Sequence, residues 1–203
     1  MPRLAVRLIF AAIVLLFVSA PIYAGNGSAV EKVDDFTLTD YNGKQHRLSD
    51  YKDAKAVVLI FVSTQCPVSN AYNERMAKLH EDFKERGVAF LGINANVAED
   101  VANIKKHAAE NKLPFVILKD KDNLIADKLE ASVTPEVYIV NAKHEVLYHG
   151  RIDDSRNAEK VTSQDTRKAL EEILAGKEVS EARTKAFGCS IKRVAKEAKK
   201  AAS

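Results

Sequence analysis

The two cysteines, Cys66 and Cys189, are the residues of this 203-residue sequence best suited to nucleophilic chemistry. Cys66 comes three residues after an apolar run and directly before Pro67, which suits the first turn of a helix because its missing N–H needs no partner there. Unpaired N–H groups at a helix N-terminus stabilise a thiolate and lower the thiol pKa. The position therefore favours a reactive cysteine over an inert buried one.

Cys189 is the other possible sulfur partner, and Gly188 before it gives the backbone freedom to present the thiol. Three alternatives stay open: a structural or catalytic disulfide with Cys66, pairing of either cysteine with another protein, and an idle Cys189. A stable bridge closing so long a loop would add roughly 4 to 5 kcal/mol. Two cysteines cannot form a disulfide framework or a four-thiolate zinc site.

Charged residues near the predicted site allow further roles. The strand after Pro135 is expected to start near Cys66, and its antiparallel partner would return to the same edge, bringing Arg151, Asp153 and Asp154 there. Arg151 would then lower the thiol pKa or bind a substrate carboxylate, or it would pair with one of the two aspartates. Glu136 would shuttle a proton or raise the thiol pKa by repulsion.

Cofactor and metal signals are weak. The five histidines are scattered, and the sequence has neither a phosphate-cradling glycine loop nor a serine-hydrolase elbow. A copper site built from Cys66, Cys189 and His149 is the one metal alternative, because thiolate and imidazole suit copper. We expect no cofactor and no metal.

The elements that must position these residues follow an alternating order. Asn42-Gly43 marks a hairpin, and the continuous apolar run 56–63 indicates a buried strand that ends just before Cys66. One long helix is expected from Pro67 to Gly87, because apolar residues recur there every three or four positions. Further strands are expected at 88–93, 115–118, 136–140 and 145–149, and further helices at 99–112, 124–129 and 163–176.

This order predicts an α/β fold with a mainly parallel, mixed central sheet covered on both faces, in which the last two strands pair antiparallel. Ligands meet such sheets beyond the carboxyl ends of the parallel strands. Cys66 would lie at that edge. An N-terminal β-hairpin and a C-terminal helical tail complete the expected fold.

Three segments carry a resemblance to the thioredoxin-like superfamily and, within it, to peroxiredoxin-like redoxins of the AhpC/TSA type. They are Phe36–Asp40 with Gly43-Lys44, the segment Val62–Ser69, and Val133-Thr134-Pro135. The resemblance covers roughly 33–176. It implies that the Thr134-Pro135 bond is cis and lies near Cys66. It also implies that a C-terminal cysteine such as Cys189 acts as a resolving thiol.

The sequence departs from both relevant motifs. Thioredoxins carry Cys-x-x-Cys, whereas here Ser69 replaces the second thiol, so it can hydrogen-bond a thiolate but cannot displace a mixed disulfide. Of the peroxiredoxin motif Pro-x-x-x-Thr-x-x-Cys, Ser63 can stand in for the threonine. Leu59 occupies the proline position, and Thr134-Pro135 falls where the activating arginine is expected.

The chain ends differ in composition from the body. Arg3 and Arg7 before the apolar run 8–20 predict a signal peptide over residues 1–24 rather than a membrane anchor, because a spanning helix needs roughly 20 apolar residues. A linker over 25–32, the domain over 33–176 and a basic tail over 177–203 carrying Cys189 would follow. Without interleaved aromatics, the basic tail gives little support to nucleic-acid binding.

The leading hypothesis is an exported thiol-disulfide oxidoreductase, periplasmic or extracellular after signal cleavage, without stable membrane insertion. Its catalytic residues would be Cys66, Cys189, Ser69, Thr134, Pro135 and Arg151. Its partners would be protein or small-molecule thiols and disulfides, with no nucleic acid. A weak thiol peroxidase is one alternative, and a non-catalytic binding or metal-delivery module is the other.

Overall fold

The computed structural model describes residues 30–195. The predicted signal peptide (1–24) and the last eight residues of the basic tail (196–203) lie outside this range. The strands are β1 (Thr37–Asp40), β2 (Gln45–Arg47), β3 (Ala56–Phe61), β4 (Val88–Asn94), β5 (Val116–Lys119), β6 (Val133–Thr134), β7 (Glu136–Val140), β8 (Val146–Gly150) and β9 (Cys189–Ser190). The α-helices are α1 (Pro67–Asn70), α2 (Asn73–Phe83), α3 (Val101–Glu110), α4 (Leu124–Lys128) and α5 (Asp165–Leu174).

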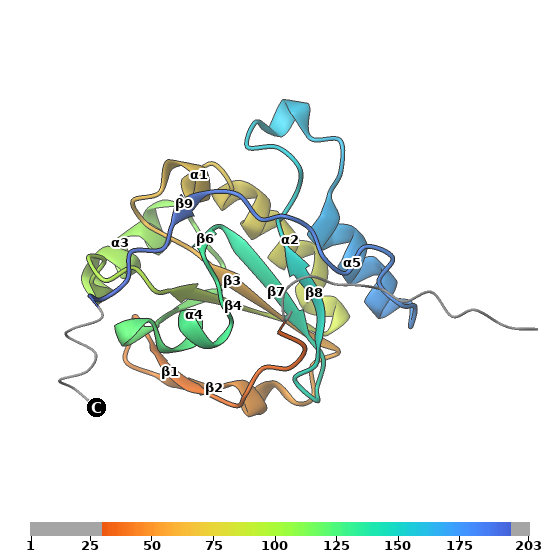
Figure 1. Ribbon diagram of the computed structural model, residues 1–203, viewed down its shortest axis with the longest axis horizontal. Helices are drawn as coiled ribbons and strands as arrows, with labels where there is room; N and C mark the ends of the chain where they lie inside the picture. Colours follow the sequence, from red (N-terminus) through yellow and green to blue (C-terminus); the bar gives the residue numbers. More distant parts are fainter. Residues whose placement is uncertain (1–29, 196–203) are drawn as a thin grey trace, which may run out of the picture.

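Seven strands form one mixed sheet in the order β2-β1-β5-β4-β3-β7-β8, flanked by helices (Figure 1). This confirms the predicted α/β class and the N-terminal hairpin. The expectation of a mainly parallel sheet was wrong, because only the β3–β4 and β4–β5 pairings are parallel. The short helix α4 leaves the chain at the edge where β5 ended, so β7 runs back beside β3.

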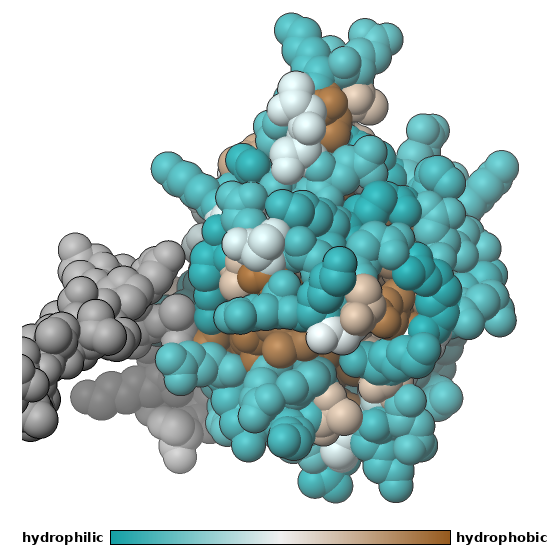
Figure 2. All heavy atoms as spheres, turned by 90° about the vertical axis from the view of Figure 1, so that its right-hand side faces the viewer, coloured by the Kyte–Doolittle hydropathy of each residue, from teal (hydrophilic) through white to brown (hydrophobic). Residues whose placement is uncertain are grey.

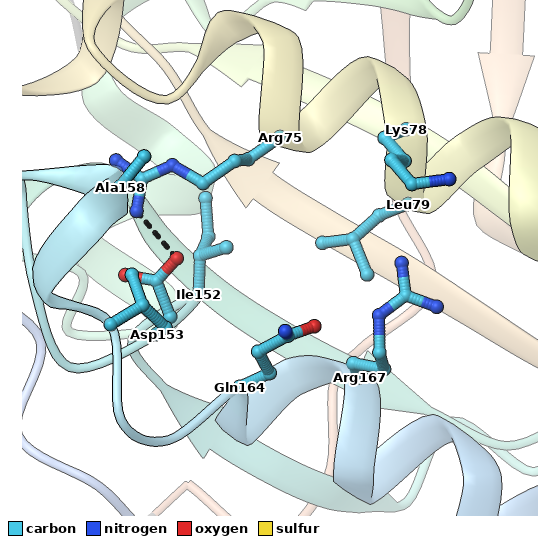
Figure 3. Close-up of a pocket in the computed structure, with 9 residues that line it drawn as sticks. Arg75, Lys78, Leu79, Ile152, Asp153, Ala158, Gln164 and Arg167 are labelled. Atoms are coloured by element: carbon cyan, nitrogen blue, oxygen red, sulfur yellow. Dashed lines mark hydrogen bonds and ion pairs between the residues drawn. The ribbon is translucent and has the colours of Figure 1, made fainter.

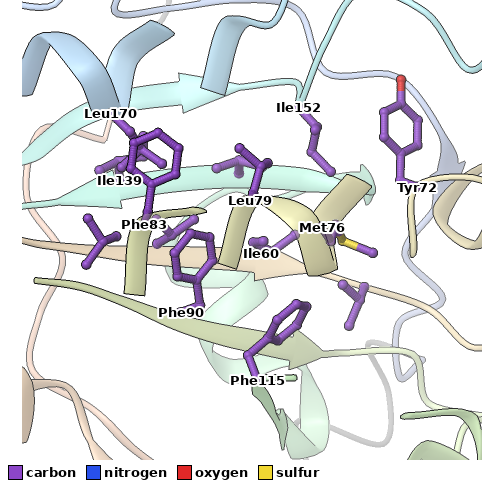
Figure 4. Close-up of a cluster of buried hydrophobic side chains, with 14 of the residues drawn as sticks. Ile60, Tyr72, Met76, Leu79, Phe83, Phe90, Phe115, Ile139, Ile152 and Leu170 are labelled. Carbon is purple, nitrogen blue, oxygen red and sulfur yellow. The ribbon is translucent and has the colours of Figure 1, made fainter. Parts of the chain in front are cut away.

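Alternate residues of the buried strand β3 face two separate hydrophobic clusters, as the pleat of a strand requires. Val58 and Ile60 face the cluster covered by α2, α3 and α5, and Figure 4 shows the α2 side chains against the strands there. Leu59 and Phe61 face the cluster covered by α4 and the hairpin. Both faces of the sheet are therefore buried. This packing holds the end of β3, and with it the loop that leads to Cys66, in one position.

The single helix predicted after Cys66 is two helices, α1 and α2, separated at Ala71 and Tyr72. The apolar spacing does not reveal this break, because Tyr72, Met76 and Leu79 still face the same cluster. α1 contains only four residues. Stabilisation of a Cys66 thiolate therefore depends on individual hydrogen bonds rather than on the dipole of a long helix.

The tail was predicted to be helical, and for its described part this is wrong. Residues 177–195 contain the short strand β9 and no helix. In Figure 1 this segment, drawn in blue, runs from α5 past β8 and across the top of β6. Its backbone makes hydrogen bonds with other parts of the fold, which favour an extended chain over an isolated helix.

Two residues at the end of the predicted linker contact the sheet. Lys32 pairs with Glu145, and the Val146 N–H donates to the Glu31 carbonyl at 2.8 Å.

The side of the molecule that shows α5 and β8 is mostly hydrophilic, with small apolar patches (Figure 2). Among residues 30–195, no helix is long and apolar enough to cross a membrane.

Candidate active site

Cys66 caps the N-terminus of α1 with an extended backbone, φ −80° and ψ 116°. Its sulfur accepts a hydrogen bond from the Ser69 backbone N–H at 3.2 Å and donates one to the Thr134 carbonyl at 3.3 Å. The residue is only 3% exposed. The thiol is thus held between the first turn of α1 and the strand β6.

Cys189 lies beside Cys66, and both are free thiols in the structure. Burial by itself would raise the pKa of Cys66, but hydrogen bonds from the Cys189 thiol, the Ser69 N–H and the Thr134 side chain outweigh it and lower the pKa. The bond to Cys66, together with burial, raises the pKa of Cys189. Cys66 is therefore the sulfur that ionises first, and Cys189 donates a hydrogen bond to its thiolate.

A buried carboxylate supports the loop that carries Cys66. The Ser63 hydroxyl accepts the Cys66 N–H at 3.0 Å and donates to Glu99 at 2.5 Å. The Thr64 N–H and the Asn94 amide also donate to Glu99, at 2.7 and 2.6 Å. Ser63, considered from the sequence as a stand-in for a threonine, thus connects Glu99 to the Cys66 backbone.

Ser69 contacts the sulfur differently from the prediction. Its backbone N–H, not its hydroxyl, donates to Cys66, and its hydroxyl accepts the Ser63 N–H at 3.2 Å. The residue is completely buried. The side chain therefore fixes the turn from β3 to α1.

The Thr134-Pro135 bond is cis, as the resemblance implied. Thr134 contacts Cys66 through its carbonyl and pairs with Cys189 in the antiparallel β6–β9 ladder. These contacts bring Cys66, Thr134, Pro135 and Cys189 together. Their joint placement is the main agreement between the predicted and the observed site.

Residues 182–194, which we call the C-terminal strap, hold Cys189 in place. His149 exchanges backbone hydrogen bonds with Ala182 and Thr184 at 2.9 and 3.0 Å. Farther along, the Ile191 N–H donates to Ser132 at 3.0 Å, and the Lys192 N–H donates to the Asn96 side chain at 2.7 Å. The strap is therefore anchored on both sides of Cys189.

Two residues of the strap explain how closely it approaches β6. A Cβ atom on Gly188 would lie 2.0 Å from the Thr134 carbonyl oxygen, so only glycine fits there. The Phe187 ring packs edge-on against Tyr72, with their centroids 6.3 Å apart. Gly188 was noted in the sequence for its freedom, but the close contact comes from the tertiary structure.

Arg151 forms an ion pair with Asp165 at 2.7 Å, rather than with Asp153 or Asp154. Asp153 accepts hydrogen bonds from the Tyr72 hydroxyl and the Arg75 guanidinium. The Asp154 carboxylate accepts a hydrogen bond from the Thr162 backbone N–H. None of these charged groups is among the contacts of the Cys66 sulfur described above.

Glu136 follows Pro135 and is 3% exposed. It accepts the Ser132 and Val133 N–H groups at 2.8 and 3.1 Å and binds His149 at 2.6 Å. Burial would raise the pKa of Glu136, but the bonds from His149, Ser132 and Val133 lower it overall. This carboxylate shapes β6, the strand that receives the strap.

A separate hollow of about 190 Å³ lies between α2 and α5 (Figure 3). Its charged side chains already have partners: Arg75 pairs with Asp153 at 2.5 Å, and Arg167 pairs with Asp82 at 2.6 Å. Cys66 does not line this hollow. Within residues 30–195, no group of three or more histidine, cysteine or acidic side chains is arranged to hold a metal.

Three residues that support the site, Glu99, Asn94 and Phe187, carry no sequence signal that predicts this role. The sequence predicts that Glu99 begins the helix over 99–112, where an acidic residue interacts favourably with the helix dipole, whereas α3 begins at Val101. Asn94 ends β4 and carried no signal of its own. No local pattern marks these residues, because their roles depend on segments that are distant in the sequence.

The sheet order, the cis-proline beside the cysteine and the strand-to-helix position of that cysteine define a thioredoxin-like fold. A sequence model of the AhpC/TSA family matches residues 30–149. This chain therefore belongs to the AhpC/TSA family.

Known proteins resemble it at moderate identity. Thiol-disulfide oxidoreductase ResA of Geobacillus kaustophilus is 32% identical over 112 residues, which cover 55% of this chain and 63% of that relative. ResA of Geobacillus thermodenitrificans is 28% identical over 150 residues, covering 71% and 84%. The crystal structure of a hypothetical protein from Sinorhizobium meliloti 1021 has a TM-score of 0.78 at 30% identity, covering 84% and 97%.

Proposed function

We propose that this protein is an exported thiol-disulfide oxidoreductase whose redox couple is Cys66 and Cys189. The observation that carries the proposal is the placement of both thiols at Thr134, which pairs with Cys189 in the β6–β9 ladder and accepts a hydrogen bond from the Cys66 sulfur. In this arrangement the pKa of Cys66 is lowered and that of Cys189 is raised. The ResA relatives, which are named thiol-disulfide oxidoreductases, support the same chemistry. The basic and apolar pattern of residues 1–24 supports export.

In this proposal, the strap supplies the second thiol that the Cys-x-x-Ser segment lacks. Oxidation of a substrate dithiol to a disulfide reduces the Cys66–Cys189 disulfide to two thiols, and two electrons and two protons pass from substrate to protein. The reverse exchange reduces a substrate disulfide. In either direction, Cys66 is the sulfur whose anion the surroundings stabilise, through Ser69, Thr134 and Cys189.

The test compares wild type with Cys66→Ser, Cys189→Ser and the control Ser190→Ala, which changes an exposed strap residue next to Cys189. Mass mapping after mild oxidation should find Cys66 joined to Cys189 in wild type and in the control. Exchange with a model dithiol should be lost in both cysteine variants. Full exchange activity in Cys189→Ser would contradict the proposed couple.

A peroxide assay on the same proteins separates this function from a thiol peroxidase. We expect dithiol exchange to be much faster than hydrogen peroxide consumption. The reason is that Arg151 pairs with Asp165 and is not among the groups that stabilise the Cys66 thiolate. Faster turnover of peroxide than of any disulfide would favour the peroxidase.

A further inference from the structure

The two sulfurs of the proposed couple differ in their access to solvent. Cys66 is 3% exposed and lies beneath the strap, whereas Cys189 is partly exposed on the strap itself. This is an unusual arrangement for a nucleophile, because the more acidic thiol is the covered one. It raises the question of which sulfur an incoming substrate reaches.

The backbone beside Cys66 is also occupied. An extended peptide can add to an exposed strand edge through main-chain hydrogen bonds. Here Cys189 and Ser190 already pair with Thr134 and Val133, and Gly188 lies against the Thr134 carbonyl. While the strap is docked, the backbone groups on this edge of β6 are already paired and cannot bind a substrate. A substrate must therefore approach Cys189 from the side that faces solvent.

We infer that, in the Cys66–Cys189 disulfide form, a substrate thiolate attacks the Cys189 sulfur, so that Cys189 carries the mixed disulfide. This inference rests on the proposed function. Attack forms a bond between the substrate sulfur and Cys189, breaks the Cys189–Cys66 bond, and releases Cys66 as a thiolate. A second substrate thiolate then attacks the first substrate sulfur, which yields the substrate disulfide and frees Cys189.

The chemistry of displacement at sulfur also favours Cys189 as the sulfur that is attacked and Cys66 as the sulfur that leaves. In displacement at sulfur the attacking, central and leaving sulfurs lie roughly in line, and Cys189 is the sulfur that an attacker from solvent reaches, because Cys66 is buried. The better leaving group is the thiol with the lower pKa. The N–H of Ser69 and the side chain of Thr134 are already placed to receive the Cys66 thiolate.

The occupied edge of β6 also limits which substrate thiols can react with Cys189. With β6 filled by the strap, recognition through strand addition is absent, and the reacting thiol has to be one that reaches Cys189 without an extended flanking peptide. Low-molecular-weight thiols and thiols on projecting turns meet this condition. Cysteines within extended segments do not, unless the strap is displaced.

The experiment mixes the oxidised full-length protein with reduced glutathione and quenches it with acid after short times. Free thiols are then alkylated, and the peptides that contain Cys66 and Cys189 are mapped by mass. We expect glutathione on Cys189 and the alkyl group on Cys66, with at least a tenfold excess over the opposite pattern. Glutathione on Cys66, or equal labelling of both, would overturn the inference.

Two variants extend the test. Gly188→Ala should lift the strap from Thr134, uncover Cys66 and move a measurable share of glutathione onto it, whereas Ser190→Ala should keep the wild-type pattern. An unchanged pattern in a folded Gly188→Ala protein would contradict shielding by the strap. If wild type forms no Cys66–Cys189 disulfide at all, the proposed function fails, which is distinct from glutathione on the wrong sulfur.

Discussion

At the scale of single residues, the acidity of Cys66 comes from a few hydrogen bonds that together outweigh its burial. Cys189 is the largest of the stabilising contributions, and the Ser69 N–H follows. The same thiol–thiol bond acts in opposite directions on its two members, because it stabilises the anion of one and the proton of the other. Each cysteine should therefore change its titration when the other is removed.

The first prediction concerns this reciprocal effect. In the reduced protein, Cys189→Ala should raise the pKa of Cys66, because the thiolate loses its largest hydrogen-bond donor. Cys66→Ala should lower the pKa of Cys189, because its proton is no longer held by a neighbouring sulfur. The thiolate absorbance in the ultraviolet, followed against pH, measures both. Shifts in the same direction in the two variants would contradict the coupling.

The second prediction is that replacing Glu99 lowers the free energy of unfolding. It accepts bonds from Ser63, Thr64 and Asn94 while being 2% exposed. Replacement by alanine leaves buried donors without a partner, which costs roughly 1–3 kcal/mol for each. Glu99→Ala should thus lower the free energy of unfolding by at least about 2 kcal/mol in urea denaturation. The exposed Glu110→Ala on α3 is the control and should change it by less than about 0.5 kcal/mol.

At the scale of elements, the strap behaves as an added strand rather than as a tail. It contacts β8 through Thr184 and β6 through Cys189, and it reaches the loop after β4 through the Val97 N–H, which donates to Lys192 at 2.9 Å. Because these bonds involve backbone groups, they depend on close approach of the chain more than on particular side chains. Gly188 is the position where that approach is tightest.

The third prediction follows for Gly188→Ala. Since the added Cβ would overlap the Thr134 carbonyl, β9 has to move away from β6. Alkylation of Cys66 by iodoacetamide in the native state should then become at least several-fold faster than in wild type. Hydrogen exchange at Ile191, whose N–H donates to Ser132, should also accelerate.

The control for that experiment is Ser190→Ala, which alters an exposed side chain but keeps the backbone pairing with Val133. It should leave both the alkylation rate and the exchange at Ile191 close to wild type. Equal acceleration in the two variants would show that any change in the strap loosens it, and that the Gly188 contact has no special part.

At the scale of the whole molecule, a disulfide between Cys66 and Cys189 would connect the turn after β3 to a segment beyond α5. Among the described residues, it would enclose the strands β4 to β8 and all five α-helices in one loop. Cross-linking so long a loop reduces the entropy of the unfolded chain more than that of the folded one. Oxidation should therefore stabilise the entire fold.

The fourth prediction gives the size of this effect. The oxidised protein should have a free energy of unfolding about 4–5 kcal/mol above that of the reduced protein, by the loop-entropy relation. Denaturation in guanidinium chloride, with and without reductant, measures the difference. Cys189→Ala is the control, and its unfolding should not respond to reductant. A reduced wild type as stable as the oxidised form would show that the thiols do not join.

Hydrophobic periodicity along the chain predicted the α/β class and the strand that leads to Cys66, because both are local signals. The cis Thr134-Pro135 bond was implied by the resemblance to thioredoxin-like proteins and not by any local pattern. The sequence left the partner of Cys66 open among three alternatives. It also predicted a helical tail, because no local signal in residues 177–195 marks an extended segment that pairs with other strands.

Long-range packing sets where Cys189 lies, why residue 188 must be glycine, and which groups hold the Cys66 loop. Each of these depends on contacts between residues far apart in the chain, such as Ser63 with Glu99 and Thr134 with Cys189. The physical reason is that a backbone edge or a buried donor takes whichever partner the packed sheet brings within reach, and the spacing of residues along the chain carries no record of that choice.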